Sequence, residues 1–427
     1  MRRLRRWILL TTGAGALGVV LWYVFRLPLF EVDMAAMAPG LLGPHVSACC
    51  GGCGQEAVVG IPSGTGTIVE RTEVACPRCS RAIAVSRKAG SQSGDKIILQ
   101  RGSRPRRWER VAYRTPSDRE QLSVLRVVGL PGEAIEIRDG DVFVDGKHAV
   151  KEPAVAPEMW IPVCATDVEG KNEARPTTRW LPAQGGSGWK QNGRGWRLDA
   201  ARDEEESLQL QGDVTDALVY NAFVAGGASQ GPSSVKDIRL ECHVQACSGD
   251  GCLGLVWSRS LQYVKATIDL KGSVSLTCSG SEALGKLQPP LAAGDRVELA
   301  VRDGQAYVAC RGQVLARLTI EPQDVPRLLT PPGTAPMTSQ PSVELSISGR
   351  GVSIVLSRIA VYRDVHYVGA SAGTIGRGRV SSSEGELTRL GPGEYFLLGD
   401  NPAIAADSRW WGPLPQAKLI GSIRRLR

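Results

Sequence analysis

The sequence contains little methionine and phenylalanine, with five residues of each among 427. It contains instead 50 glycines and 26 prolines, a composition that favours many turns and short strands over long helices. No stretch interleaves aromatic residues with a dense basic stripe, so the net charge of +8 does not indicate a nucleic-acid partner. Because 42% of the residues are apolar, two or three domains can each bury a core, and we expect a mainly β protein.

One long hydrophobic run occurs at residues 7–25, where nineteen uncharged residues lie between four arginines and Arg26. A helix of that length spans a bilayer. A cleaved signal peptide is the alternative, but its apolar core would be shorter and would end at small residues, whereas this run ends in Leu-Trp-Tyr-Val-Phe. The basic segment 1–6 predicts a cytoplasmic N-terminus. We therefore expect a single-pass protein of the cell membrane, with the bulk of the chain outside the cytoplasm.

A polar segment near the C-terminus follows a predicted strand at residues 395–398. Two turns are predicted in it, formed by Gly399, Asp400 and Asn401 and by Asp407, Ser408 and Arg409. This order resembles the C-terminal box of type I signal peptidases, membrane-bound Ser/Lys endopeptidases that remove signal peptides. In that family a helper serine lies two residues before the Asp-Ser-Arg run. The resemblance puts Ala405 at the helper position.

The same family carries Ser-Gly-Ser-Met-x-Pro just outside its membrane anchor, and the second serine is the nucleophile. Directly after the predicted anchor of this chain, Met37 and Pro39 fit that register. Met34, Ala35 and Ala36 replace Ser-Gly-Ser. The resemblance therefore puts Ala36, which has no oxygen for attack, at the nucleophile position. It also puts the Met34 thioether in place of an oxyanion-hole hydroxyl.

A third family segment, Lys-Arg-Val-x-Gly-x-Pro-Gly-Asp, supplies the catalytic lysine. Residues 122–147 resemble it and are predicted to form strands and turns. The matching residues are Arg126, Val127, Gly129, Pro131 and Gly132. The lysine position is Leu125, and leucine fits an apolar pocket but cannot carry a proton. No histidine replaces it, because His45 and His148 are predicted to be solvated loop residues.

Two Cys-x-x-Cys pairs, separated by 22 residues, resemble the knuckles of a zinc ribbon. The four residues are Cys50, Cys53, Cys76 and Cys79. Thiolates at this spacing close a tetrahedral site with no open position, which predicts a structural zinc ion. Disulfides are the alternative, because the segment is expected outside the cytoplasm, where thiols tend to oxidise.

Residues 152–368 do not fit the signal peptidase pattern and form a separate β-rich block. Alternating strands recur in it about every dozen residues, which predicts a two-sheet sandwich. A resemblance to laminin-G and concanavalin-like sandwiches implies binding of glycans or proteins. A spacer domain whose tryptophans lie in the core is the alternative. The block contains six cysteines, for which an exported domain predicts disulfides of unknown pairing.

The predicted organisation places two insertions in a signal-peptidase-like antiparallel β core. In chain order the parts are a cytoplasmic segment (1–6), the transmembrane helix (7–25), the first part of the core (26–43), the zinc-ribbon-like insertion (44–93), the second part of the core (94–151), the β-sandwich insertion (152–368), and a linker with the third part of the core (369–427).

The resemblance predicts a loss of catalysis, because Ala36, Leu125 and Ala405 replace the nucleophile, the base and the helper while the turns around them remain. We expect such a protein to bind exported peptide segments or envelope partners. Two alternatives stay open. One is an active signal peptidase with unrecognised catalytic residues, and the other is a surface-binding module that works through the sandwich.

Overall fold

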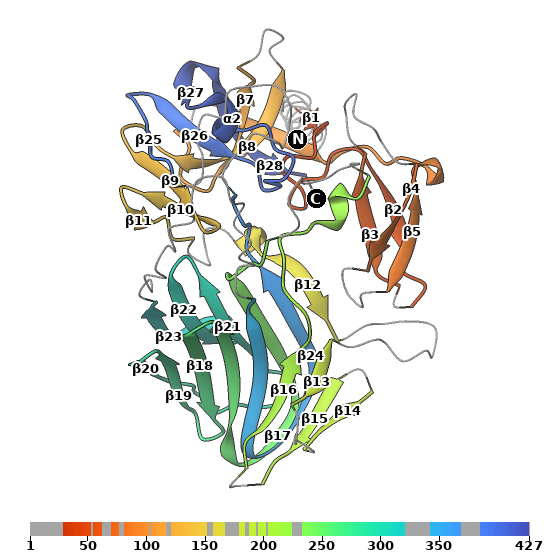
Figure 1. The fold of residues 1–427 in the computed structure, drawn as a ribbon, viewed down its shortest axis with the longest axis vertical. Helices are drawn as coiled ribbons and strands as arrows, with labels where there is room; N and C mark the ends of the chain where they lie inside the picture. Colours follow the sequence, from red (N-terminus) through yellow and green to blue (C-terminus); the bar gives the residue numbers. More distant parts are fainter. Residues whose placement is uncertain are drawn as a thin grey trace, which may run out of the picture.

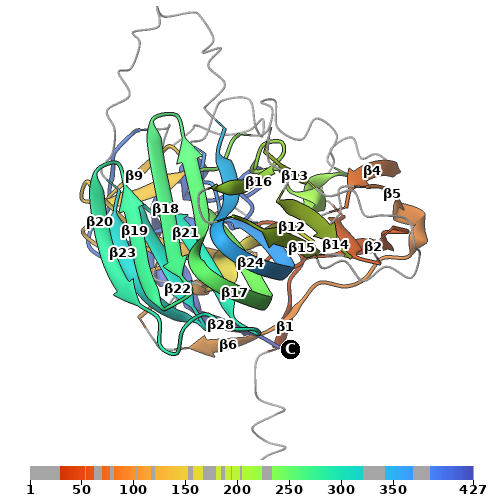
Figure 2. The same ribbon diagram turned by 90° about the horizontal axis from the view of Figure 1, so that it is seen from below.

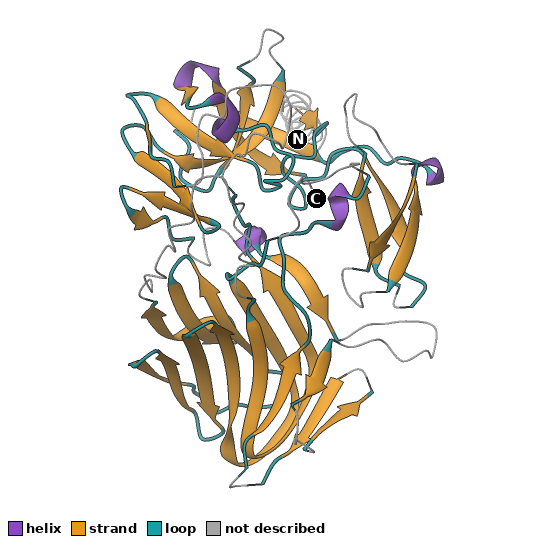
Figure 3. Ribbon diagram, in the orientation of Figure 1, coloured by secondary structure: helices purple, strands orange, loops and turns teal. Residues whose placement is uncertain are grey.

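The computed structural model describes residues 29–52, 54–61, 70–76, 81–101, 104–116, 121–151, 157–166, 179–183, 188–193, 195–201, 204–223, 233–320, 342–368 and 385–426. Strands dominate this part of the chain (Figure 3), and its one α-helix is the single turn α2 (Ser408–Trp411). The protein is mainly β, as the composition predicts. None of the described helices is long and apolar enough to cross a membrane, and the expected anchor at residues 7–25 lies outside the described residues.

A seven-stranded antiparallel sheet is built from both ends of the chain, and it contains β8 and β26 of the family segments. In spatial order its strands are β1 (Leu29–Glu31), β6 (Lys96–Arg101), β28 (Leu419–Arg425), β7 (Arg110–Arg114), β8 (Leu122–Gly129), β26 (Glu394–Leu398) and β27 (Leu414–Pro415). The apolar side chains of β8 contact two clusters, with Val124, Leu125 and Val127 in one and Val128 in the other. This strand is therefore buried along almost its whole length.

A smaller four-stranded sheet lies beside the first in Figure 1. Its order is β11 (Lys147–His148), β10 (Asp141–Val144), β9 (Ala134–Arg138) and β25 (Thr388–Arg389). The hairpin between β9 and β10 turns at Asp139 and Gly140, whose φ angles are +48° and +86°. Positive φ at both central residues is what a two-residue type I′ turn requires, so this Asp-Gly turn is of that type.

The segment with the cysteine pairs forms two small hairpins, β2 (His45–Cys49) with β3 (Glu56–Gly60) and β4 (Arg71–Ala75) with β5 (Ala82–Ser86). Cys50 and Cys76 directly follow β2 and β4 and are buried in one apolar cluster. Cys53 and Cys79 lie outside the described residues. The zinc site therefore stays a prediction. We call residues 44–93 the ribbon module.

Two histidines differ from the expectation of solvated loop positions. His45 lies in β2 and is 8% exposed, and its Nδ1 is 2.8 Å from the carbonyl oxygen of Gly43. His148 ends β11, where its Nε2 is 3.3 Å from a carboxylate oxygen of Asp141. His45 lies opposite Gly60 and Gln92, and His148 lies opposite Phe143, so pairing with these residues places both histidines in strands.

The sandwich (residues 152–368) is organised around two long neighbouring strands, β17 (Ile238–Arg259) and β24 (Glu344–Arg363), seen side by side in Figure 2. The first half of β17 pairs with β21 (Arg296–Arg302) and the second half with β18 (Gln262–Asp269), with register shifts between them. The remaining strands are β12 (Ile161–Ala165), β13 (Trp180–Pro182), β14 (Trp189–Asn192), β15 (Gly195–Asp199), β16 (Glu206–Leu210), β19 (Ser273–Cys278), β20 (Ser281–Lys286), β22 (Gln305–Cys310) and β23 (Gln313–Thr319).

Tryptophans of the sandwich lie in its core and not on its surface. Trp180, Trp189, Trp196 and Trp257 are at most 5% exposed and belong to the main apolar cluster. These four side chains therefore offer no exposed ring on which a sugar can stack.

The six cysteines of the sandwich form no disulfide, which corrects the expectation from an exported domain. They are Cys164, Cys242, Cys247, Cys252, Cys278 and Cys310. Cys242 and Cys310 illustrate the reason, because both lie opposite Val297 and β21 runs between them. The two cysteines are therefore separated by two strand spacings, about 9.6 Å, whereas a disulfide needs Cα atoms within about 7 Å.

Candidate functional site

The three positions predicted to have lost catalytic groups lie together. Ala36 follows β1, Leu125 lies in β8, and Ala405 follows β26; their exposed fractions are 5%, 1% and 0%. A Cβ atom built on Gly399 would be 2.4 Å from Ala405 Cβ, 2.6 Å from the Ala36 carbonyl oxygen and 3.4 Å from Leu125 Cδ2. These atoms therefore surround one point, and no side-chain hydroxyl or amine comes from any of the three residues.

A narrow cleft runs beside this point, between the segment that follows β1 and the first half of β8. Its lining residues are Phe30, Glu31, Val32, Asp33, Met34, Ala36, Met37, Ile97, Leu122, Ser123 and Val124. The Ser123 hydroxyl donates to Met34 Sδ at 3.5 Å, so these two side chains connect the walls. The free volume is about 20 Å³, which is room for about one water molecule. The cleft is present, but Met34 narrows it.

One edge of β8 is open along this cleft. The strand β26 pairs with β8 only at residues 126–129. Val127 N donates to Glu109 O on the β7 side, and the odd residues of β8 therefore face β7. The backbone groups of Leu122 and Val124 point the other way, and no described strand pairs with them there. This half of β8 offers a free edge for an extended peptide.

The C-terminal box is held by a buried pair between Arg126 and Asp400. Arg126 Nε and Nη2 donate to the two carboxylate oxygens of Asp400 at 2.7 and 2.6 Å. Burial alone would lower the pKa of Arg126, but the Asp400 carboxylate raises it above its ordinary value. Because Arg126 lies in β8 next to Leu125, the pair ties the box to the strand that carries the lysine position.

A second set of bonds fixes the turn after β26. Asp407 caps α2 and accepts from Arg409 Nε at 2.8 Å and from Gly399 N at 3.1 Å. The Ser408 hydroxyl accepts from Leu397 N at 2.9 Å. These four polar contacts are internal to the core, so Asp407, Ser408 and Arg409 have a structural role in this fold.

The other residues singled out from the family segments shape the backbone. Met37 is 1% exposed in the cluster below the cleft, and Pro39 lies in the turn that follows it. A Cβ on Gly129 would lie 2.8 Å from three neighbouring side chains, so only glycine fits there. Pro131 and Gly132 form the turn after β8, where Gly132 has φ +88°. None of them brings a reactive group to the cleft.

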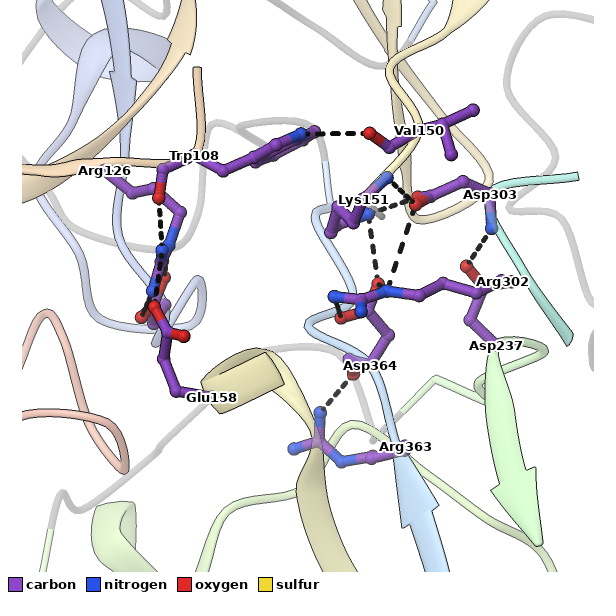
Figure 4. Close-up of polar contacts among 11 residues, drawn as sticks. Trp108, Arg126, Val150, Lys151, Glu158, Asp237, Arg302, Asp303, Arg363 and Asp364 are labelled. Carbon is purple, nitrogen blue, oxygen red and sulfur yellow. Dashed lines mark hydrogen bonds and ion pairs between the residues drawn. The ribbon is translucent and has the colours of Figure 1, made fainter. Parts of the chain in front are cut away.

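An ion network that the sequence did not reveal joins the core to the sandwich (Figure 4). Lys151 is 2% exposed, and its ammonium contacts carboxylates of Asp303 and Asp364, the latter at 3.0 Å. Arg302 donates twice to Asp364, at 3.0 and 2.9 Å. Burial alone would lower the pKa of Lys151, but Asp303 and Asp364 raise it above its ordinary value. The insertion is therefore docked on the core by buried charges.

Trp108 connects this network to the C-terminal box. Its carbonyl accepts from Arg126 Nη1, and its indole Nε1 donates to Val150 O at 3.3 Å. The Lys151 ammonium lies 4.8 Å from the centre of the indole ring. Figure 4 shows Trp108 between Arg126 and Lys151. Contacts therefore run without a break from Asp400 to the sandwich.

Three carboxylates of the network could suggest a metal site, because oxygens of Asp141, Asp237 and Asp303 lie within 4.8 Å of one another. The cluster already contains cations, since Lys236 Nζ is 3.1 Å from Asp141 and Lys151 contacts Asp303. Burial, together with the neighbouring carboxylates, raises the pKa of Asp237 well above its ordinary value. The two lysines balance part of the negative charge without a bound ion, and the geometry fits docking.

Comparison with known proteins agrees with the core geometry. Residues 79–180 and 344–426 match the family described as signal peptidase, peptidase S26. The interruption between the two matched ranges falls in the sandwich, and the matched ranges include Leu125 and Ala405 but not Ala36. Over these ranges the chain is similar to signal peptidase I.

Solved structures similar to part of the chain are β proteins at low identity. A carbohydrate binding module CBM66 from Bacillus subtilis is 10% identical, with 44% of this chain and 93% of that chain covered and a TM-score of 0.25. A laminarinase from Rhodothermus marinus is 13% identical, with 48% and 98% covered and a TM-score of 0.32. An endo-beta-1,3-glucanase from Pyrococcus furiosus is 10% identical, with 56% and 100% covered and a TM-score of 0.32.

Proposed function

We propose that this chain, which is similar to signal peptidase I over residues 79–180 and 344–426, is a catalytically inactive relative that binds extended peptides. The observation that carries the proposal is the meeting of Ala36, Leu125 and Ala405 beside Gly399. Side chains without hydroxyl or amine occupy the nucleophile, base and helper positions, while the turns and ion pairs around them persist. Loss of a nucleophile and base that act as a unit removes nearly all catalysis.

An active enzyme would need a different nucleophile and base at the cleft. Ser123 is the one hydroxyl residue among the described residues that line it, and this hydroxyl donates to Met34 Sδ. The neighbouring phenol of Tyr113 cannot act as its base at neutral pH, because burial raises the pKa of Tyr113 to about 12. The described lining contains neither lysine nor histidine, and its carboxylates are Glu31, which accepts from Gly94 N, and Asp33. This composition supports binding over cleavage.

The ligand that fits is an extended segment of an exported protein. A free strand edge at Leu122 and Val124 can form backbone hydrogen bonds with such a segment, as in other cases of strand addition. Met34 narrows the cleft, and its unbranched thioether side chain can change rotamer to admit the ligand.

The proposal extends to the predicted anchor and to the two cysteine pairs, which lie wholly or partly outside the described residues. We infer that residues 7–25 anchor the chain in the cell membrane, with the bulk of the chain outside the cytoplasm. We also infer that Cys50, Cys53, Cys76 and Cys79 hold a structural zinc ion, which their spacing supports. Metal analysis of the purified chain and of a Cys50→Ser variant tests the zinc, which should be present at one ion per natural chain and reduced in the variant.

Restoring the three groups tests the loss of catalysis. The triple variant Ala36→Ser, Leu125→Lys, Ala405→Ser is compared with the natural protein on a secretory precursor. We expect no cleavage by the natural protein and measurable cleavage by the variant. The matched control lacks only the base, with Ala36→Ser and Ala405→Ser, and should stay inactive. Cleavage by the natural protein at high concentration would refute the proposal.

Binding is tested separately with fluorescent signal-peptide segments on the full chain in detergent. Val124→Pro removes the backbone N–H of residue 124, which faces the cleft. Peptide binding should weaken by about tenfold, the cost of about one hydrogen bond. Leu284→Ala, at an exposed position of β20 in the sandwich, is the control. Thermal unfolding checks that both variants fold. If the natural protein shows no affinity for any of these segments, peptide binding is excluded.

A further inference from the structure

A short arm of the sandwich insertion leaves the sandwich and reaches the core. The arm comprises residues 218–223 and contains the 3-10 helix η3 (Val219–Asn221). In Figure 1 the short green helix near the ribbon module is this arm, far from the strands of the sandwich. The arm lies outside both ranges that resemble signal peptidase. Its role therefore cannot be taken from that family.

The arm is anchored on the ribbon module by two aromatic side chains. Phe223 is 0% exposed and belongs to the same apolar cluster as Cys50 and Cys76. The Tyr220 ring lies against Gly60, where an added Cβ would be 2.2 Å from Tyr220 Cε1. Glycine at position 60 thus lets the ring approach the backbone of β3, and the arm is fixed on both sides of Asn221.

Asn221 lies between these anchors and forms a reciprocal amide pair with Asn401 of the C-terminal box. Asn221 Nδ2 donates to Asn401 Oδ1 at 2.9 Å, and Asn401 Nδ2 donates to Asn221 Oδ1 at 2.8 Å. Asn401 is 0% exposed. Its second Nδ2 hydrogen goes to Ala35 O at 3.1 Å, and its backbone N donates to Ala36 O at 2.9 Å. Asn401 therefore holds two successive carbonyls at the nucleophile position.

We propose that Asn221 is a positioning residue for the cleft, and that the sandwich insertion completes the cleft through it. Removing the Asn221 amide leaves one donor and one acceptor of the buried Asn401 without partners. A buried amide in that state turns toward other partners or admits water, because an unsatisfied buried group is costly. Either change weakens the hydrogen bond from Asn401 Nδ2 to Ala35 O, and the turn that forms one wall of the cleft becomes less rigid.

Hydrogen exchange on the detergent-solubilised full chain tests this role without any ligand. In Asn221→Ala the peptides that cover residues 34–42 and 399–406 should exchange about tenfold faster, which corresponds to the loss of about one buried hydrogen bond. Asn221→Asp keeps the acceptor but not the donor and should lie between. Asn192→Ala, at an exposed position of β14, is the matched control and should match the natural protein.

Peptide affinity provides the second readout, and this part rests on the function proposed above. Asn221→Ala should raise Kd about tenfold, and adding it to Asn401→Ala should change little more, because the two residues act as one pair. Unchanged exchange at residues 34–42 would overturn the role of Asn221, and so would equal acceleration throughout residues 238–259. Faster local exchange in a protein that binds no peptide would uphold the positioning role and reject the proposed function.

Discussion

Lys151→Met removes the ammonium that joins the core to the sandwich while keeping an unbranched side chain of similar length. In the natural protein this ammonium contacts the carboxylates of Asp303 and Asp364. All three side chains are nearly inaccessible, with exposed fractions of 1%, 2% and 1%. The variant would leave Asp303 buried without its main cation.

The magnitude follows from this burial. Breaking a buried ion pair by removing one partner costs about 3–5 kcal/mol of unfolding free energy, because a charge stays behind without compensation. Arg302 still donates twice to Asp364, which limits the loss. We therefore expect the unfolding free energy to fall by about 3 kcal/mol, the lower end of this range. Lys151→Met combined with Asp303→Asn should recover part of it, because the remaining carboxylate is removed.

Urea unfolding of the full chain, followed by tryptophan fluorescence, measures the effect, since Trp108 lies against Lys151. The control is Lys265→Met. Lys265 is 2.6 Å from Glu205, but the two side chains are 23% and 46% exposed. Such a pair contributes at most about 1 kcal/mol. If Lys151→Met loses no more stability than Lys265→Met, the network does not hold the sandwich to the core, and the reasoning is wrong.

Three further predictions concern single sites. The raised pKa of Asp237 makes the folded state bind more protons than the unfolded state, so this group lowers stability as pH rises above about 4. The variant Asp237→Asn should therefore have a higher urea midpoint than the natural protein at pH 8 but not at pH 4. Equal midpoints of the two proteins at both pH values would contradict this. Gly399→Ala should cost about 1–3 kcal/mol in thermal unfolding, because its Cβ would meet Ala405 and the Ala36 carbonyl, and Ala405→Gly should partly restore stability. Burial raises the pKa of Cys242, so a maleimide should label this thiol only as the sandwich opens, and rapid labelling of the folded protein would refute its burial.

Sequence alone located much of the core, because its family segments combine turn residues with fixed polar partners. Asp400 and Arg126 are 274 residues apart, yet each belongs to a recognisable segment, and the structure pairs them. The Asp-Gly hairpin at residue 139 is likewise a local signal, since positive φ restricts which residues fit. Such features are predictable because the cause lies within a few residues.

Other features depended on distant partners and escaped the sequence analysis. Residues 237–244 and 252–258 each have the alternating pattern of a separate strand. They form one strand, β17, because β24 runs alongside and pairs across the polar, glycine-containing stretch between them. Lys151 precedes an acidic residue and a proline, a pattern typical of exposed loops. Its burial follows from Asp303 and Asp364, which no local pattern connects to it. The role of Asn221 could not be predicted for the same reason, since its partner Asn401 lies 180 residues away.

The two ends of the sandwich insertion meet at the hairpin of β9 and β10. Ala149 N donates to Val142 O, and Tyr367 N donates to Gly140 O, so the chain leaves and returns at neighbouring positions of the β9 and β10 hairpin. A domain whose ends lie so close can be gained or lost in one genetic event without rethreading its host. A version with a short linker between residues 151 and 366 should therefore keep the order of the seven core strands. Such a version would lack the partners of Lys151, so natural chains without the insertion are expected to differ at this position.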